Sequence, residues 1–61
     1  MYIINNKGYI FNTDLMHEIM ADNTHILAVY GNSTRTISYN PAELKTIVDA
    51  LKRGASVVEV D

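Results

Sequence analysis

The polar residues that follow the hydrophobic run 24–30 have the side chains most suited to chemistry. The segment 30–36 reads Tyr-Gly-Asn-Ser-Thr-Arg-Thr and brings together hydroxyls, a carboxamide and a guanidinium. Arginine binds phosphate or carboxylate through two parallel hydrogen bonds, and a glycine lets backbone amides approach such an anion. The candidate anion-binding residues are Tyr30, Asn32, Ser33, Thr34 and Arg35. The alternative is a hairpin turn in which the Gly and Asn serve only to reverse the chain.

The histidines and acidic residues offer weaker candidates. His17 and His25 could meet across adjacent strands, but two imidazoles need a third ligand such as Glu18 to hold a metal ion. Asp14, Glu18 and Asp22 recur every four residues, a spacing that a solvated face explains better than acid–base chemistry. We therefore expect no metal site and no cofactor.

Catalytic patterns are missing from the sequence. Ser33 has no His–Asp arrangement near it in sequence and does not lie in a Gly-x-Ser-x-Gly segment. The chain has no cysteine, which excludes disulfides and thiolate zinc sites. We expect a protein that is not an enzyme and has no catalytic residues.

The strongest structural pattern begins at Asn40. Asn40 is a favourable N-cap, and Pro41 suits the first helical position because its missing N–H costs nothing there. Glu43 is expected to reach back to the cap, and Gly54 is expected to end the helix. An apolar stripe follows at helical spacing: Leu44, Ile47, Val48 and Leu51. The sequence predicts an amphipathic helix over 41–53, with this stripe packed on a sheet.

Short β-prone runs provide that sheet. The runs 2–4 and 9–11 flank Asn-Asn-Lys-Gly, which predicts a hairpin. The first run begins almost at the start of the sequence, so we expect an edge strand or a strand that pairs with another subunit. The runs 24–30 and 34–39 predict a second hairpin, and 55–60 predicts a last strand after the helix. Because both faces of 24–30 are largely apolar, that strand is expected to be central or to be covered by a partner on one face.

The segment 13–21 fits two interpretations. As a helix, Thr13 would be the cap, and an apolar stripe would comprise Leu15, Met16, Ile19 and Met20. As a strand, one face would be apolar apart from a histidine and the other would be mixed. Local propensity favours the helix, whereas the family resemblance described below favours a strand. We predict a strand.

These elements indicate an α+β fold in one domain, 1–61. The expected architecture is a small antiparallel β-meander of about five strands, the last one after the helix, with the amphipathic helix at 41–53 packed on it. A chain of 61 residues buries only roughly 60% of its unfolded surface, so its core is marginal for a monomer. Self-association or docking on a partner is the expected support.

The net charge limits the partners. Five Lys and Arg against seven Asp and Glu give −2, whereas a dedicated nucleic-acid binder normally has a basic excess. No apolar run approaches the length of a membrane span, and the N-terminal residues lack the order of a signal peptide. We expect a cytoplasmic protein without a nucleic-acid or membrane partner.

From Asn6 to Leu51 the order of patterns resembles the FlbD family of small flagellar-operon proteins. The matching segments are Lys7-Gly8-Tyr9-Ile10-Phe11-Asn12, Leu15-Met16-His17-Glu18-Ile19, Thr24-His25-Ile26-Leu27, Gly31-Asn32, Ile37 and the stripe from Leu44 to Leu51. The same series is similar to the second half of LytTR-type DNA-binding domains, in which the Asn-x-x-Leu-x-x-x-Ile segment forms a strand. The resemblance implies a meander followed by a helix and brings no catalytic residues. The chain departs from these patterns in its Gly-Asn turn, its strand after the helix and its lack of a basic surface.

Two functions are consistent with the sequence. The first is a non-enzymatic regulatory or protein-interaction module that acts as a homo-oligomer and binds itself or another protein. The alternative is a small phage or cellular protein that sequesters a small anionic, nucleotide-like ligand through the 30–36 segment.

Overall fold

Six strands, one 3-10 turn and one α-helix make up the computed structural model, which describes all of residues 1–61. The elements are β1 (Tyr2–Ile4), β2 (Ile10–Asn12), η1 (Thr13–Leu15), β3 (Glu18–Ala21), β4 (Ile26–Tyr30), β5 (Ser33–Ser38), α1 (Glu43–Lys52) and β6 (Val57–Glu59). The predicted α+β class is confirmed, as are the position of the helix and the strand that follows it.

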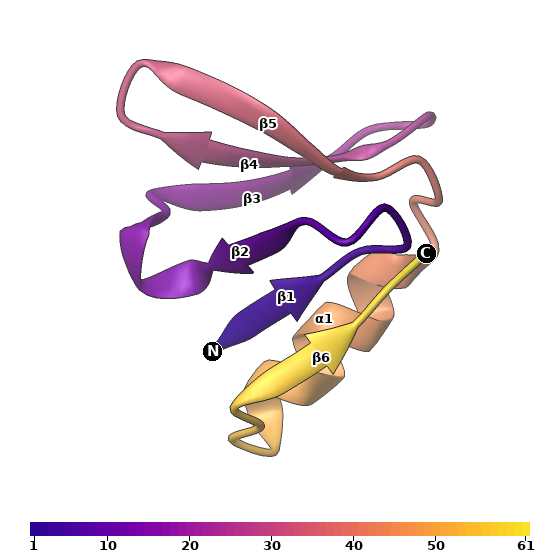
Figure 1. The fold of residues 1–61 in the computed structure, drawn as a ribbon. Coiled ribbons are helices and arrows are strands. Elements are labelled where there is room, and N and C mark those ends of the chain that lie inside the picture. The colour runs from indigo at the N-terminus through magenta and orange to yellow at the C-terminus, as the bar shows by residue number, and fades with distance from the viewer.

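The strands form two sheets of three strands each. The first sheet has the order β2-β1-β6, and the second sheet has the order β3-β4-β5 (Figure 1). Neighbouring strands are antiparallel except β1 and β6, which are parallel. The central position predicted for the run 24–30 is confirmed, because β4 lies between β3 and β5.

The prediction that the first strand is an edge strand or pairs with another subunit is wrong, because β1 is the centre of the first sheet. After α1 the chain returns as β6 along the free side of β1. The amide of Tyr2 donates to the carbonyl of Ser56 (2.8 Å), and the amide of Val60 donates to the carbonyl of Ile4 (2.9 Å). Parallel strands need a long crossover connection, and the connection from β1 to β6 runs through β2 to β5 and ends with α1.

The segment 13–21 is a strand only in its second half. The 3-10 turn η1 precedes β3, so the predicted strand is confirmed over 18–21 and wrong at 13–15. The amide and hydroxyl of Thr13 both donate to the carbonyl of Met1 (3.0 and 2.9 Å), and Asn12 Oδ1 accepts from the Asp14 amide (3.0 Å). These polar contacts reverse the chain between the two sheets and interrupt the strand.

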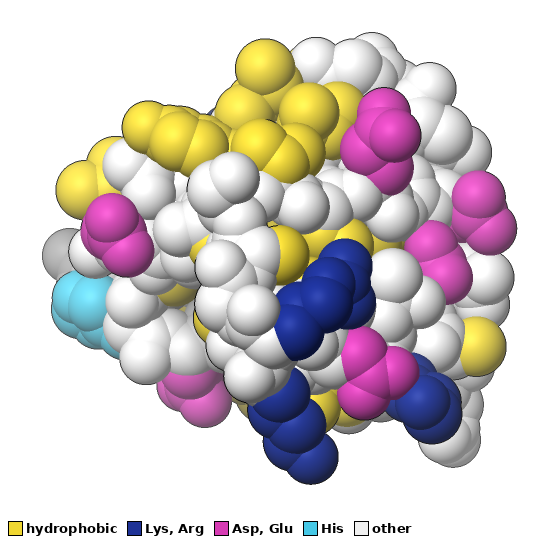
Figure 2. Space-filling model, turned by 90° about the horizontal axis from the view of Figure 1, so that it is seen from below, with side chains coloured by type: hydrophobic (Ala, Val, Ile, Leu, Met, Phe, Trp, Pro, Cys, Tyr) yellow, Lys and Arg dark blue, Asp and Glu magenta, His cyan; other side chains and the backbone are white.

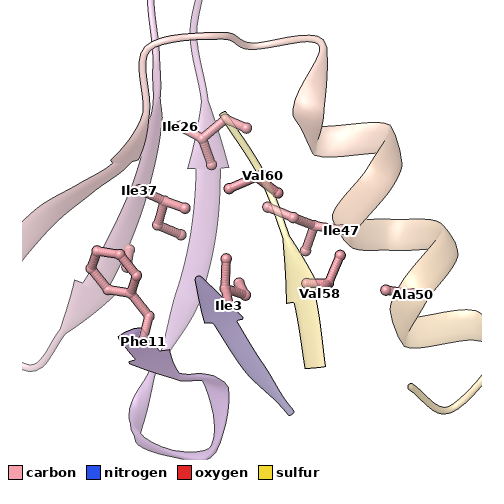
Figure 3. Close-up of a cluster of buried hydrophobic side chains, with 9 residues drawn as sticks. Ile3, Phe11, Ile26, Ile37, Ile47, Ala50, Val58 and Val60 are labelled. Carbon is pink, nitrogen blue, oxygen red and sulfur yellow. The ribbon is translucent and has the colours of Figure 1, made fainter. Parts of the chain in front are cut away.

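The core lies between the two sheets and α1. Its members are Ile3, Phe11, Ile26, Ala28, Ile37, Ile47, Ala50, Val58 and Val60. Figure 3 shows Ile47 and Ala50 of α1 directed toward the β6 segment. Alternate residues of each strand therefore face inward, and their sequence neighbours form two outer sheet faces.

The buried side of α1 differs from the predicted stripe. Ile47 and Ala50 are fully buried and Leu44 is half-buried, whereas Val48 and Leu51 are exposed. The helix contacts β6, and the short side chain of Ala50 lets it lie close to that strand. No helix of the structure combines the length and hydropathy needed to cross a membrane.

The helix is shorter than the predicted 41–53 and begins at Glu43. The N-cap residue is Ala42, so the prediction of Asn40 as the N-cap is wrong; Asn40 Oδ1 accepts from the Ala42 amide (3.3 Å) in the turn that leads into the helix. The sequence predicted that the carboxylate of Glu43 reaches back to the cap. It instead accepts from the backbone amide of Asp61 (2.9 Å). Gly54 ends the helix with a φ of 70°, a conformation that glycine adopts without strain.

Candidate functional site

A cleft of about 520 Å³ lies between the β1–β2 turn and strand β5 with the residues that follow it. This volume lies within the roughly 300–1,000 Å³ of small-molecule sites. The lining residues are Asn5, Asn6, Lys7, Tyr9, Arg35, Thr36, Ile37, Ser38, Tyr39, Asn40 and Asp61. They come from segments about thirty residues apart in the chain, so the cleft exists only in the folded protein.

Asn5 fixes the two walls of the cleft relative to each other. Its side-chain amide donates to the carbonyl of Ile37 in β5 (3.0 Å). Its Oδ1 accepts from the amides of Lys7 (3.1 Å) and Tyr9 (3.0 Å), which orders the β1–β2 turn. Because Asn5 is buried and makes all three contacts inside the protein, it is a structural element of the cleft.

Each wall presents one cation and one tyrosine. Lys7 of the turn lies over the Tyr39 ring, with 5.4 Å between Nζ and the ring centroid. Arg35 of β5 lies over the Tyr9 ring, with 5.6 Å between Cζ and the centroid. Cation–π contacts at exposed sites stabilise by roughly 0.5–1 kcal/mol, so these positions are held weakly.

The charges of the cleft are unbalanced. Lys7 and Arg35 have no carboxylate within 4.0 Å. The contacts between basic and acidic side chains lie elsewhere, between Lys45 and Asp49 on α1 and between His25 and Asp22 in the β3–β4 turn. Asp61 is the only acidic lining residue, and its Oδ2 accepts from the side-chain Nδ2 of Asn40 (3.4 Å). Two cations against one carboxylate make this a positive region on a chain of net charge −2.

Only Arg35 of the five predicted site residues lines the cleft. The segment 30–36 is not a loop, because Tyr30 and Ser33 are paired and only two residues form the turn between β4 and β5. Asn32 and Thr34 are exposed on that turn and strand. Tyr30 packs against the core, and burial raises its pKa while the Arg35 charge opposes this. Binding of an anion by this segment stays a prediction.

The histidines lie at opposite ends of the β3–β4 hairpin. The amide of His17 donates to the carbonyl of Val29 (2.8 Å), whereas the carbonyl of His25 accepts from Asp22 at the other end (3.1 Å). The structure brings together no group of three or more His, Asp and Glu side chains that could hold a metal ion.

The exposed carboxylate of Asp22 organises the β3–β4 turn. Its Oδ1 accepts from the amide and the hydroxyl of Thr24 (2.8 and 2.9 Å) and from the amide of His25 (3.0 Å). These hydrogen bonds lower the pKa of Asp22 to about 2, and the bond from the Thr24 amide has the largest effect. The turn is a structural feature rather than a binding site.

The outer face of the first sheet is largely apolar. Its residues, two from each strand, are Tyr2, Ile4, Ile10, Asn12, Val57 and Glu59. Tyr2 and Val57 are each 48% exposed and Ile10 is 64% exposed, although all three are large apolar side chains. Figure 2 shows hydrophobic side chains gathered along the upper edge of the view, whereas the Lys and Arg side chains lie in its centre and lower part.

The outer face of the second sheet is more polar. Its residues are Glu18, Met20, Leu27, Val29, Thr34 and Thr36. Met20 is 47% exposed, whereas Leu27 and Val29 are half-buried between their neighbours. The first sheet therefore presents the more hydrophobic of the two outer faces.

Several residues of the cleft were not predicted from the sequence, namely Asn5, Lys7, Tyr9 and Tyr39. The segment Asn5-Asn6-Lys7-Gly8 was interpreted only as a hairpin turn. The sequence does contain one indication of the cleft: in each wall a cation is followed within four residues by a tyrosine, Lys7 by Tyr9 and Arg35 by Tyr39. The contact between Asn5 and Ile37, 32 residues apart, leaves no local pattern.

No family model matches the chain, and comparisons with curated proteins and with solved structures give no significant match. The resemblance to the FlbD family and to LytTR-type domains therefore stays a prediction.

Proposed function

We propose that this chain is a non-enzymatic protein-interaction module that forms a homodimer through the outer face of the first sheet. The observation that carries the proposal is the apolar surface made by the exposed Tyr2, Ile10 and Val57 around the half-buried Ile4. Contiguous exposed apolar surface on a small protein is typical of an interaction site. The non-enzymatic part rests on the sequence, which offers no nucleophile with a neighbouring base.

A second copy is the occupant that the charges of this face favour. Glu59 is the only charged residue among its six positions, so two copies can stack with little repulsion despite a net charge of −2 on each. Sheets commonly pack face to face about 10 Å apart through apolar side chains. Tyrosine is enriched in interface cores, and Tyr2 stands on the central strand of this face.

The size of the face predicts a weak dimer. The six outer positions span roughly 10 Å by 7 Å, since strands lie about 5 Å apart and alternate residues about 7 Å apart. Stable complexes bury roughly 800 Å² on each partner, so this face is the centre of an interface that includes flanking residues. Completing the burial of the three exposed apolar side chains contributes on the order of 3 kcal/mol on each copy. Association itself costs about 4–15 kcal/mol, so even with the flanking contacts we expect a weak dimer with a dissociation constant near the millimolar range.

Sedimentation velocity over a micromolar to millimolar concentration series tests the proposal. The wild-type chain should shift from monomer to dimer as its concentration rises. Ile10→Glu should remain monomeric, because it places a carboxylate at the most exposed apolar position of the face. Its stability to urea should change little, since exposed positions usually tolerate substitution within about 0.5 kcal/mol.

Met20→Glu is the matched control. Met20 is also an exposed apolar residue on an edge strand, but it belongs to the outer face of the second sheet. This variant should dimerise like the wild type. A wild-type chain that stays monomeric throughout the series would overturn the proposal. So would a dimer that Met20→Glu disrupts and Ile10→Glu leaves intact, because the second sheet would then be the interface.

A regulatory role and a cytoplasmic location extend this proposal. A weak dimer exchanges readily with other partners of the same face, so a second protein with an apolar face could displace one copy. The resemblance to the FlbD family supports a non-catalytic role of this kind. Competition by a candidate partner, measured as loss of the homodimer signal in the same sedimentation experiment, would test it.

A further inference from the structure

We propose that the cleft between the β1–β2 turn and β5 binds a mononucleotide. The sequence alternative placed a nucleotide-like ligand at residues 30–36, and the proposal moves the site to residues that only the fold brings together. Arg35 belongs to both, whereas Lys7, Tyr9 and Tyr39 belong to the cleft alone.

The two cations are available to an anionic group. Neither Lys7 nor Arg35 forms an ion pair, and each rests over a tyrosine ring from the opposite wall of the cleft. A phosphate offers charge-assisted hydrogen bonds that exceed a cation–π contact in strength, so a bound phosphate would draw these side chains toward it. Arg35 is suited to bidentate contact, and Lys7 to contact as a point charge.

The two tyrosines supply the surface for a base. Tyr9 is 53% exposed and Tyr39 is 70% exposed, although each lines the cleft. Exposed aromatic rings beside cations are the combination on which nucleic-acid bases stack. The Tyr39 ring already stacks on His25, with 6.0 Å between the ring centroids, so the Tyr9 ring offers the better surface for a base. A phosphate alone would make no stacking contact with either ring. We therefore infer a ligand that carries an aromatic ring as well as a phosphate.

The cleft is already organised before a ligand binds. Asn5 orders the β1–β2 turn through two hydrogen bonds and joins it to β5 through a third. At the end of β5, Ser38 Oγ accepts from the backbone amide of Asn40 (3.0 Å). No buried side-chain nitrogen or oxygen lacks a partner. The ligand therefore meets the exposed side chains of two fixed walls and loses little free energy to ordering the backbone.

A single nucleotide fits these observations better than a strand. The cleft has the volume of a small-molecule site, and the net charge of −2 on the chain disfavours the repeated phosphates of a nucleic acid. Asp61 at the cleft also limits the negative charge that the site accepts. A monophosphate suits it better than a triphosphate.

Titration of the ¹⁵N-labelled chain with adenosine monophosphate, followed through amide chemical shifts, tests the proposal. Saturable shifts are expected at Lys7, Tyr9, Arg35 and Tyr39. Lys7→Gln should weaken binding about tenfold, because it removes one charge-assisted contact and retains most of the side chain. Arg53→Gln removes an exposed cation outside the cleft and should bind like the wild type.

Three results would overturn the proposal. The first is the absence of saturable shifts up to millimolar adenosine monophosphate. The second is binding that Asn32→Ala weakens and Lys7→Gln does not, which would return the site to the β4–β5 turn. The third is a single-stranded oligonucleotide that binds far more tightly with a steep salt dependence, which would identify a strand as the ligand. Inorganic phosphate should bind at least tenfold more weakly than the nucleotide, since it does not engage the tyrosines.

Discussion

Two side chains, Asn5 and Asp22, each accept hydrogen bonds from backbone amides in a turn, yet they differ in burial. Asn5 is buried and joins two walls of the cleft, whereas Asp22 is exposed and orders only its own turn. Loss of a buried partner leaves a polar group without water, whereas loss of an exposed partner is compensated by solvent. The two residues therefore predict effects of different size.

Asn5→Ala should destabilise the protein by about 2–3 kcal/mol, because the carbonyl of Ile37 and two amides of the β1–β2 turn lose their partner. Urea denaturation followed by circular dichroism measures this change. Asn6→Ala, at the exposed neighbouring position, should change the stability by no more than about 0.5 kcal/mol. Equal effects of the two substitutions would contradict the structural role of Asn5.

The carboxyl group of Asp22 should titrate near pH 2, which is below the value of about 3.9 for an unperturbed aspartate. Because the folded pKa lies below the unfolded value, the turn contributes its full stability above about pH 4 and loses it as the pH falls toward 2. The ¹³C shift of the carboxyl carbon reports the midpoint. Thr24→Val removes one donor and should move the midpoint upward. A midpoint near 3.9 in the wild type would show that the turn hydrogen bonds are absent in solution.

At the scale of elements, the sequence predicted those that local chemistry determines. The hairpin around Gly31 and the helix that ends at Gly54 follow from turn residues and hydrophobic spacing. The central place of β1 was missed because it depends on β6, more than fifty residues away. The 3-10 turn η1 was missed because Thr13 bonds to Met1, a contact that no local pattern encodes. The cleft was missed for the same reason, since its walls are joined by a long-range hydrogen bond.

The contact between α1 and β6 gives a test at this scale. Ala50→Leu should destabilise the protein by about 1–3 kcal/mol, because the added atoms have no space between the helix and β6. Val48→Leu, on the exposed side of the same helix, should change the stability by less than about 0.5 kcal/mol. Urea denaturation of both variants measures the difference. A larger loss for Val48→Leu would mean that the predicted stripe, rather than the observed side of α1, faces the core.

At the scale of the whole molecule, a core of nine buried residues supports two sheets and a helix. A domain of this size has a stability of roughly 3–9 kcal/mol, so an additional apolar contact between copies is a substantial gain. The outer face of the first sheet is best suited to such a contact. The cleft lies elsewhere, between the β1–β2 turn and β5. Dimer formation and ligand binding can therefore be tested independently.

Isotope-filtered nuclear Overhauser spectroscopy on a mixture of labelled and unlabelled chains tests the proposed dimer most directly. At concentrations where the dimer forms, we predict intermolecular contacts between the Tyr2 ring of one copy and the methyl groups of Ile4, Ile10 or Val57 of the other. The absence of intermolecular contacts at millimolar concentration would contradict the account. Contacts confined to Met20, Leu27 and Val29 would contradict it equally, because they would place the interface on the second sheet.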